Sequence, residues 1–304
     1  MHRASCGIQT TRLAVLAGVL VLLLAASGYA QGIVVDEIVR TFPAKGRTLI
    51  LVKSVDGRIR IVSGTQPEVN IRATKEVLRA GSQDEARRAA AEVDIRLEQF
   101  GERVEIEAKY PKQWNFFGTG PKVLAHFEVV APPNSDLEVR NVDGSVVAEG
   151  FAGHIDLATV DGSLTARQCT GTVTAKTVDG SLELRNVHGD VSAHTTDGKL
   201  SIDGVFRTLE AQSTDGSINI TVEPGSKMGG EWSIRSSDGS IHIELPPDFS
   251  ADLEARTGDG QIKCDYPITT SRSVDKHRLS GKINGGGNLL RVQSGDGNIN
   301  IIKF

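Results

Sequence analysis

The sequence predicts a mainly β protein. Its larger part is expected to be a parallel β-solenoid (β-helix-like) of about eight coils of 18 residues each, behind a small α+β N-terminal cap. Three observations predict this fold. An Asp-Gly pair recurs nine times, five of the pairs follow one another at an interval of 18 residues, and the same apolar pattern surrounds every pair. Self-similarity at a fixed period is typical of stacked repeat units, and it argues against a globular enzyme with a deep pocket.

Each copy of the repeat reads as two short strands joined by a turn. Apolar residues stand six and four positions before the Asp, and three and five positions after it. A spacing of two is the period of a strand, so the apolar residues of each half share one face. Gly tolerates positive φ and Asp can hydrogen-bond the backbone that follows, so the pair supplies the turn. The expected turn residues are Asp143, Gly144, Asp161, Gly162, Asp179, Gly180, Asp197, Gly198, Asp215 and Gly216.

This pattern fits two arrangements of the strands. In the solenoid each copy is one coil, and equivalent residues stack about 4.8 Å apart. In an antiparallel β-meander or sandwich each Asp-Gly is a hairpin turn, and the same residues again share a face. Open twisted sheets rarely exceed ~10 strands, so the solenoid is preferred and the meander is kept as the alternative.

Residues 1–30 have the pattern of a secretory signal peptide. Arg3 and Arg12 give a basic start, residues 13–26 form an apolar run, and Gly28-Tyr29-Ala30 is a small-x-small cleavage site. The run is shorter than the ~20 residues of a membrane span, so cleavage near Ala30 is expected to leave no transmembrane helix. This pattern predicts export to the periplasm or the cell surface.

Residues 31–131 are predicted to form the cap, which contains the first copy of the repeat at Ile50–Ile61. A helix start at Ser82 and several alternating segments indicate mixed α and β structure. A cap is expected because an open end of stacked strands exposes unpaired edges. Residues 132–304 form the predicted repeat domain, in which residues 265–288 read as a surface loop.

The repeats resemble a known family. The series Asn141-Val142-Asp143-Gly144-Ser145-Val146, Thr159-Val160-Asp161-Gly162-Ser163-Leu164 and Thr177-Val178-Asp179-Gly180-Ser181-Leu182, preceded by Val130-Ala131-Pro132, is similar to the bacterial putative-adhesin β-strand-repeat family, a domain of unknown function. The resemblance covers residues 32–304. It implies an envelope protein with a solenoid-like repeat, and it brings no catalytic residues with it.

Composition excludes several function classes. Without Arg3 and Arg12 the 34 basic residues become 32, which against 38 acidic residues gives a net charge of −6 and argues against a nucleic-acid partner. The histidines and cysteines lack metal-ligand spacing, and no nucleophile elbow or phosphate-binding loop is present. No cofactor is therefore predicted.

Two features are candidate contact sites. One is a basic stripe three positions before the Asp, which points outward and would contact an anionic ligand such as a glycan or an envelope phosphate: Lys53, Arg140, Lys176, His194, Arg235 and Arg256. Interleaved acidic residues allow the alternative that these charges only keep the surface soluble. The other is an aromatic loop that either contacts a partner or plugs the end of the stack: Tyr110, Trp114, Phe116 and Phe117.

The predicted function is that of a non-enzymatic exported envelope protein with an elongated surface, in an adhesin-like binding role or as a scaffold. Its expected partner is a protein or glycan of the cell envelope, and its oligomeric state is not predicted. One alternative is a carbohydrate-active β-helix enzyme, which would need carboxylates gathered in a cleft. The other is a self-polymerising structural protein, which would need an uncapped end such as the strand at residues 298–304.

Overall fold

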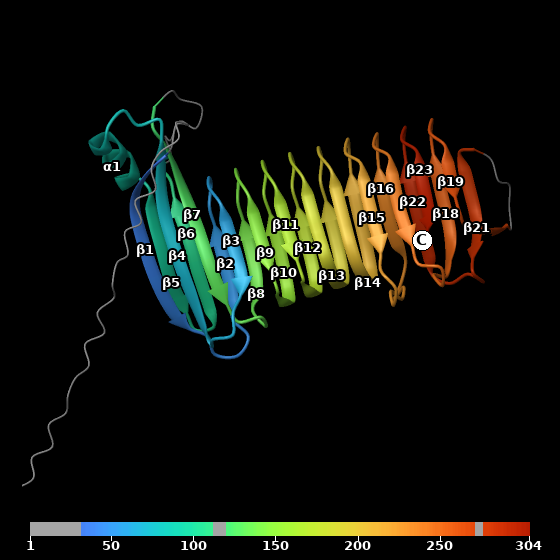
Figure 1. Ribbon diagram of the computed structural model, residues 1–304, viewed down its shortest axis with the longest axis horizontal. Coiled ribbons are helices and arrows are strands. Elements are labelled where there is room, and N and C mark those ends of the chain that lie inside the picture. Colours follow the sequence, from blue (N-terminus) through green and yellow to red (C-terminus); the bar gives the residue numbers. More distant parts are fainter. Residues whose placement is uncertain (1–31, 112–119, 271–275) are drawn as a thin grey trace, which may run out of the picture. The chain divides into compact units, whose positions relative to one another are not determined.

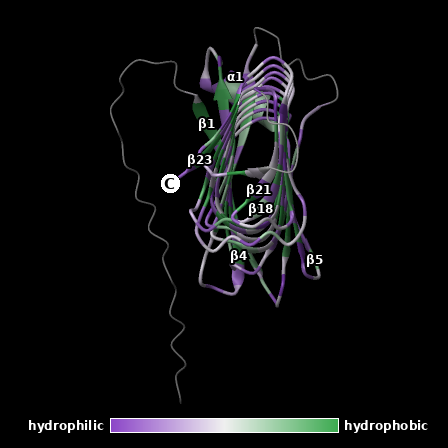
Figure 2. Cartoon of the chain, turned by 90° about the vertical axis from the view of Figure 1, so that its right-hand side faces the viewer, coloured by the Kyte–Doolittle hydropathy of each residue, from purple (hydrophilic) through white to green (hydrophobic). Residues whose placement is uncertain are grey.

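The computed structural model describes residues 32–111, 120–270 and 276–304. The fold is mainly β, with 61% of residues in strands and 3% in helix, which confirms the predicted class. The strands belong to one mixed parallel and antiparallel sheet. Figure 2 looks along the row of strands and shows the sheet bending round a common interior.

The repeat copies contribute most of the strands, which Figure 1 shows side by side. Copies one to five comprise β2 (Leu49–Lys53), β3 (Ile59–Ser63), β8 (Asp136–Arg140), β9 (Val146–Glu149), β10 (Ala152–Ala158), β11 (Leu164–Arg167), β12 (Thr170–Lys176), β13 (Leu182–His194) and the start of β14 (Leu200–Ser213). The later copies comprise the rest of β14, β15 (Ile218–Val222), β16 (Trp232–Ser236), β17 (Ile241–Leu245), β18 (Ala251–Thr257), β19 (Ile262–Cys264), β22 (Leu289–Ser294) and β23 (Ile299–Lys303).

Successive copies pair with one another in parallel. Leu164 is the register partner of Leu182, which is in turn the partner of Leu200. All three side chains are fully buried. A hairpin meander would instead pair the two strands of one copy in antiparallel fashion. Equivalent residues 18 positions apart therefore lie side by side in the sheet.

The turns require glycine for two reasons. Gly162 and Gly180 have φ values of 123° and 134°, which residues with a side chain rarely adopt. A Cβ on Gly162 would also lie 2.4 Å from the carbonyl oxygen of Gly144 in the preceding copy. The hydrogen bond expected from the Asp carboxylate is not what holds the turn. The Asn141 amide and the Thr195 hydroxyl, two positions before the Asp, donate to the Asp carbonyl instead.

The order of the copies in space departs from their order in the sequence. β22 pairs with β16 on one side and with β18 on the other, and β23 likewise lies between β17 and β19. The ninth copy therefore lies between the seventh and the eighth. All copies share one apolar pattern, so the pattern does not fix their order, and the long segment before the ninth copy lets the chain return.

The segment at residues 265–288, predicted as a surface loop, contains two strands that cover the end of the row. They are β20 (Thr269–Thr270) and β21 (Arg278–Ile283), and β21 pairs in antiparallel fashion with both β18 and β20. Tyr266 is buried, and its hydroxyl donates to the carbonyls of Leu245 and Pro246. The uncapped end expected at the C-terminal strand is wrong, because β23 has a partner on each side.

The N-terminal part mixes helix and strand as predicted. Its elements are β1 (Ile33–Pro43), β4 (Glu68–Leu78), α1 (Gln83–Ala91), β5 (Asp94–Phe100), β6 (Arg103–Lys109) and β7 (Lys122–Ala131). β6 and β7 pair in parallel with the first copy, and β5, β4 and β1 extend the two sides in antiparallel fashion. Ser82 caps α1 by accepting a hydrogen bond from the Glu85 amide, as its sequence predicts.

Candidate functional site

The six residues of the basic stripe lie in one row across the sheet. Each side chain points outward because the residues next to it in the strand face the interior: Lys176, for example, stands between buried Ala175 and Thr177. In register order the row reads Lys53, Arg140, Ala158, Lys176, His194, Gln212, Arg235, Gln293, Arg256 and Arg278. We call this row the basic file.

The N-terminal half of the basic file is partly neutralised by its neighbours. Arg140 forms ion pairs with Asp156 and Glu138, and Lys53 is the register partner of Glu107. His194 lies 3.8 Å from Glu210. Burial lowers the pKa of His194, and the Lys176 ammonium also lowers it, against the opposing effect of Glu210. Arg140 is therefore neutralised in this half, while the exposed Lys176 forms no ion pair within the described residues.

The C-terminal half gathers three arginines in one hollow of about 620 Å³. Arg235 comes from β16, Arg256 from β18 and Arg278 from β21, and Gln212 and Gln293 also line the hollow. Arg256 forms an ion pair with Glu254. Arg235 and Arg278 form no ion pair with any carboxylate in the described parts of the chain. We call this site the arginine hollow.

Arg278 is a member of the hollow that the repeat pattern does not predict. It lies in β21, outside the apolar repeat pattern from which the stripe was identified. The alternation of Arg278, Leu279 and Ser280 was an available strand signal, since Leu279 is buried between two outward neighbours. Only the pairing of β21 with β18 brings Arg278 beside Arg256.

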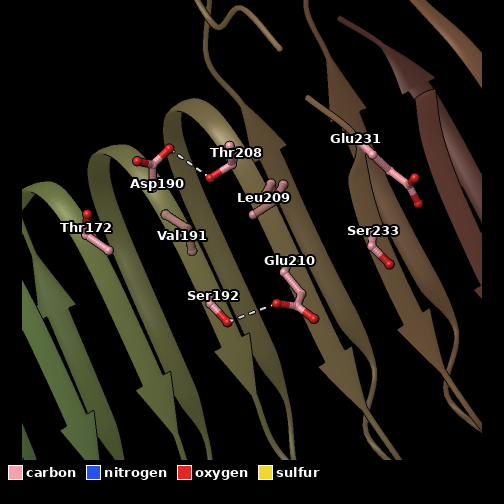
Figure 3. Close-up of a pocket in the computed structure, with 9 residues that line it drawn as sticks. All are labelled: Thr172, Asp190, Val191, Ser192, Thr208, Leu209, Glu210, Glu231 and Ser233. Atoms are coloured by element: carbon pink, nitrogen blue, oxygen red, sulfur yellow. Dashed lines mark hydrogen bonds between the residues drawn. The ribbon is translucent and has the colours of Figure 1, made fainter. Parts of the chain in front are cut away.

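A second hollow, of about 430 Å³, lies on β12, β13, β14 and β16 and was also not predicted (Figure 3). Besides the apolar Val191 and Leu209, hydroxyls and carboxylates line this site, which we call the hydroxyl-lined hollow: Thr172, Asp190, Ser192, Thr208, Glu210, Glu231 and Ser233. Its carboxylates already have partners. The Thr208 hydroxyl donates to Asp190 at 2.8 Å, the Ser192 hydroxyl to Glu210 at 3.3 Å, and the Arg291 guanidinium to Glu231 at 2.6 Å.

Tyr110 is the one residue of the aromatic loop that the structure describes; Trp114, Phe116 and Phe117 lie outside the described residues. Its hydroxyl donates to the carbonyl oxygens of Asp56 and Val123, at 3.1 and 3.2 Å. Burial raises the pKa of Tyr110 well above its ordinary value. Tyr110 thus holds the first repeat turn against the start of β7.

The Asp-Gly pairs form a ladder of turns. Asp56, Asp143, Asp161, Asp179 and Asp197 are successive parallel bridge partners. Lys122 of β7 forms ion pairs at one end of this row, with its Nζ 2.6 Å from Asp56 and 3.3 Å from Asp143. No group of three or more His, Cys, Asp or Glu side chains in the described chain is placed to hold a metal ion. The same residues include no helix of sufficient length and apolarity for a membrane span.

The family model for Toastrack DUF4097 matches residues 53–302 of this chain. The protein belongs to the Toastrack DUF4097 family. This agrees with the predicted resemblance to adhesin-type repeat proteins of unknown function. No curated protein matches the chain.

Several solved structures are similar at low identity. A "putative cell adhesion protein" from Clostridium sporogenes is 13% identical, with a TM-score of 0.32, and the match covers 88% of this chain and 99% of that one. A "putative adhesin" from Bacteroides fragilis is 12% identical, with a TM-score of 0.34, over 88% and 97%. A "putative lipid binding protein" from Parabacteroides distasonis is 10% identical, with a TM-score of 0.26, over 88% and 97%.

Proposed function

We propose that this Toastrack protein is a non-enzymatic, exported protein of the cell envelope. In this proposal its repeat region is a parallel β-solenoid, and the outward basic file is the surface with which it binds a glycan or protein of the envelope. The observation that carries the proposal is the basic file itself. Six residues predicted from sequence parity lie in a single row on paired strands, where backbone hydrogen bonds fix their spacing.

A rigid row of polar side chains suits binding better than chemistry. Hydrolysis of a glycan needs one carboxylic acid and one carboxylate on either side of the scissile bond. The carboxylates of the hydroxyl-lined hollow are instead engaged, since Asp190 pairs with Arg207 and Glu231 with Arg291. The arginine hollow presents cations, which bind and position anions.

The binding role is tested by cosedimentation of the mature chain with isolated cell envelopes at low and high salt. We expect salt-sensitive binding, which falls when Lys176, Arg235 and Arg256 are all replaced by Gln. The matched control replaces three exposed basic residues outside the file, Arg58, Lys199 and Lys263, by Gln. Equal binding by the two triple variants, or no binding by the wild type, would refute the proposal.

Export is tested separately on the full-length chain. Expressed in a bacterial host, the protein is expected in the periplasmic or surface fraction, with an N-terminus near Gln31 by mass spectrometry. A full-length protein that stays in the cytoplasm with residues 1–30 attached would contradict this part of the proposal.

A further inference from the structure

The arginine hollow concentrates three like charges, of which only Arg256 has a carboxylate partner, Glu254, within the described residues. Arg256 and Arg278 are direct register partners on antiparallel strands. Like charges directly opposite each other on a sheet are destabilising. Arg235 lies two strands away, with Gln293 between it and Arg256, which places its Cα about 10 Å from that of Arg256. The site therefore holds three guanidinium groups in a repulsive arrangement.

Arg140, in the same basic file, differs from the arginines of the hollow in its carboxylate partners. Arg140 lies in the same row but is paired with two carboxylates, whereas Arg235 and Arg278 have none in the described chain. A guanidinium carries five N–H donors in a planar fork and has no acceptor. The donors of Arg235 and Arg278 are thus available to an anion from outside the protein.

The chemistry of the hollow favours an oxyanion. The guanidinium fork matches phosphate and carboxylate with two parallel hydrogen bonds, and several arginines around one anion favour the higher charge of phosphate. The Gln212 and Gln293 amides can donate to further oxygens or to hydroxyls.

The residues that line the arginine hollow favour a polymer chain over a membrane as the source of the bound phosphate. A protein that lies on a bilayer buries apolar side chains beside its cations. The other residues that line the hollow are serines, glycines, Thr257 and Asp238. The exposed large apolar residues of the described chain, such as Val34, Phe100 and Val160, do not line it. The basic file continues from the hollow through Gln212, along which an extended chain could lie.

We propose that Arg235, Arg256 and Arg278 bind the phosphate groups of a phosphorylated envelope glycan, with the polymer running along the basic file. The assignment of the polymer to the envelope rests on the proposed function. The phosphate site itself stands on the geometry of the hollow and can be tested without it.

The test measures binding of the mature chain to long-chain polyphosphate by calorimetry. Polygalacturonate, heparin, uncharged dextran and phosphatidylglycerol vesicles are compared at the same salt concentration. Polyphosphate is expected to bind most tightly of these probes. Arg235→Gln and Arg278→Gln are each expected to weaken binding about tenfold, the effect of losing one charge-assisted contact. The control Arg58→Gln replaces an exposed arginine outside the file that forms no ion pair with the described residues, and it should change the affinity less than twofold.

Thermal melts separate binding from folding. Removing one member of a like-charge pair should leave the melting temperature of Arg278→Gln equal to or above that of wild type, while polyphosphate affinity falls. An equal loss of affinity in Arg58→Gln, or tighter binding of vesicles, dextran, polygalacturonate or heparin than of polyphosphate, would overturn the proposal. Polyphosphate binding at the hollow without binding to cell envelopes would keep the phosphate site and refute the proposed envelope role.

Discussion

At the scale of single residues, the two-residue period within each strand decides whether a side chain is buried or exposed. Leu182 and Lys176 are six positions apart, yet Leu182 is fully buried between Leu164 and Leu200 while Lys176 faces solvent. The sequence alone predicted this difference, because Lys176 follows the inward Ala175 in β12, whereas Leu182 begins β13 on the inward face, beyond the Asp-Gly turn. The same parity located six members of the basic file.

Leu182→Asp is expected to lower the free energy of unfolding by about 4 kcal/mol or more, because it buries an unpaired carboxylate among apolar neighbours. Lys176→Ala should change it by less than ~0.5 kcal/mol. Urea denaturation followed by circular dichroism measures both values. Similar losses in the two variants would show that the assigned facing is wrong.

Gly162→Ala is expected to destabilise the protein by about 2 kcal/mol, since it adds a Cβ at φ 123° against the Gly144 carbonyl. Gly230→Ala is the matched control, because a Cβ there would meet no atom within 4 Å. Urea denaturation followed by circular dichroism measures the free energy of unfolding of both variants. A neutral Gly162→Ala would mean that the turns of adjacent copies do not approach as closely as described.

His194 should make stability depend on pH. Its folded pKa lies below the ordinary value of 6.5, chiefly because burial disfavours the charged ring. Its stabilising contribution is therefore present above pH 6.5 and is lost as pH falls through the folded pKa. The melting temperature of His194→Gln should fall less than that of wild type between neutral and mildly acidic pH. An NMR titration that gives a pKa above 6.5 would contradict this.

At the scale of elements, the sequence predicted strands and turns but not their order. The ninth copy has the same apolar pattern as the others, so nothing in β22 and β23 indicates a place between the seventh and eighth copies. β21 was missed for a related reason: its surroundings are rich in Gly, Ser and charge, which predicts a loop. The position of the ninth copy and the strand β21 both bring together the arginines of the hollow, so the sequence did not predict this site.

Deleting residues 289–304 should therefore disturb more than a terminal repeat. It removes the strands to which β16, β17, β18 and β19 are bonded. We expect amide exchange in these four strands to become at least about tenfold faster, because their hydrogen bonds open to solvent. Unchanged protection of β16 and β17 would mean that the ninth copy lies outside the eighth, because the ninth copy would then have no contact with these two strands.

At the scale of the Gly32–Phe304 unit, one row of paired strands carries both the core and the proposed binding surface. The inward files are apolar and give the stack its stability, while the outward files are free to hold charges. The distribution of charge along the basic file depends on which copies are neighbours. The intercalated ninth copy separates Arg235 from Arg256 by Gln293, and β21 adds Arg278.

The arginine hollow depends on the order of the copies in the sheet, and distances between spin labels report that order. Labels are placed on Lys176 and either Gln293 or Arg256, in a chain whose cysteines are replaced by Ala. Four strand spacings separate residues 176 and 293, about 19 Å, and five separate residues 176 and 256, about 24 Å. We expect the 176–293 distance to be the shorter of the two. A shorter 176–256 distance would mean that the copies follow the order of the sequence, and it would contradict the arrangement on which the arginine hollow depends.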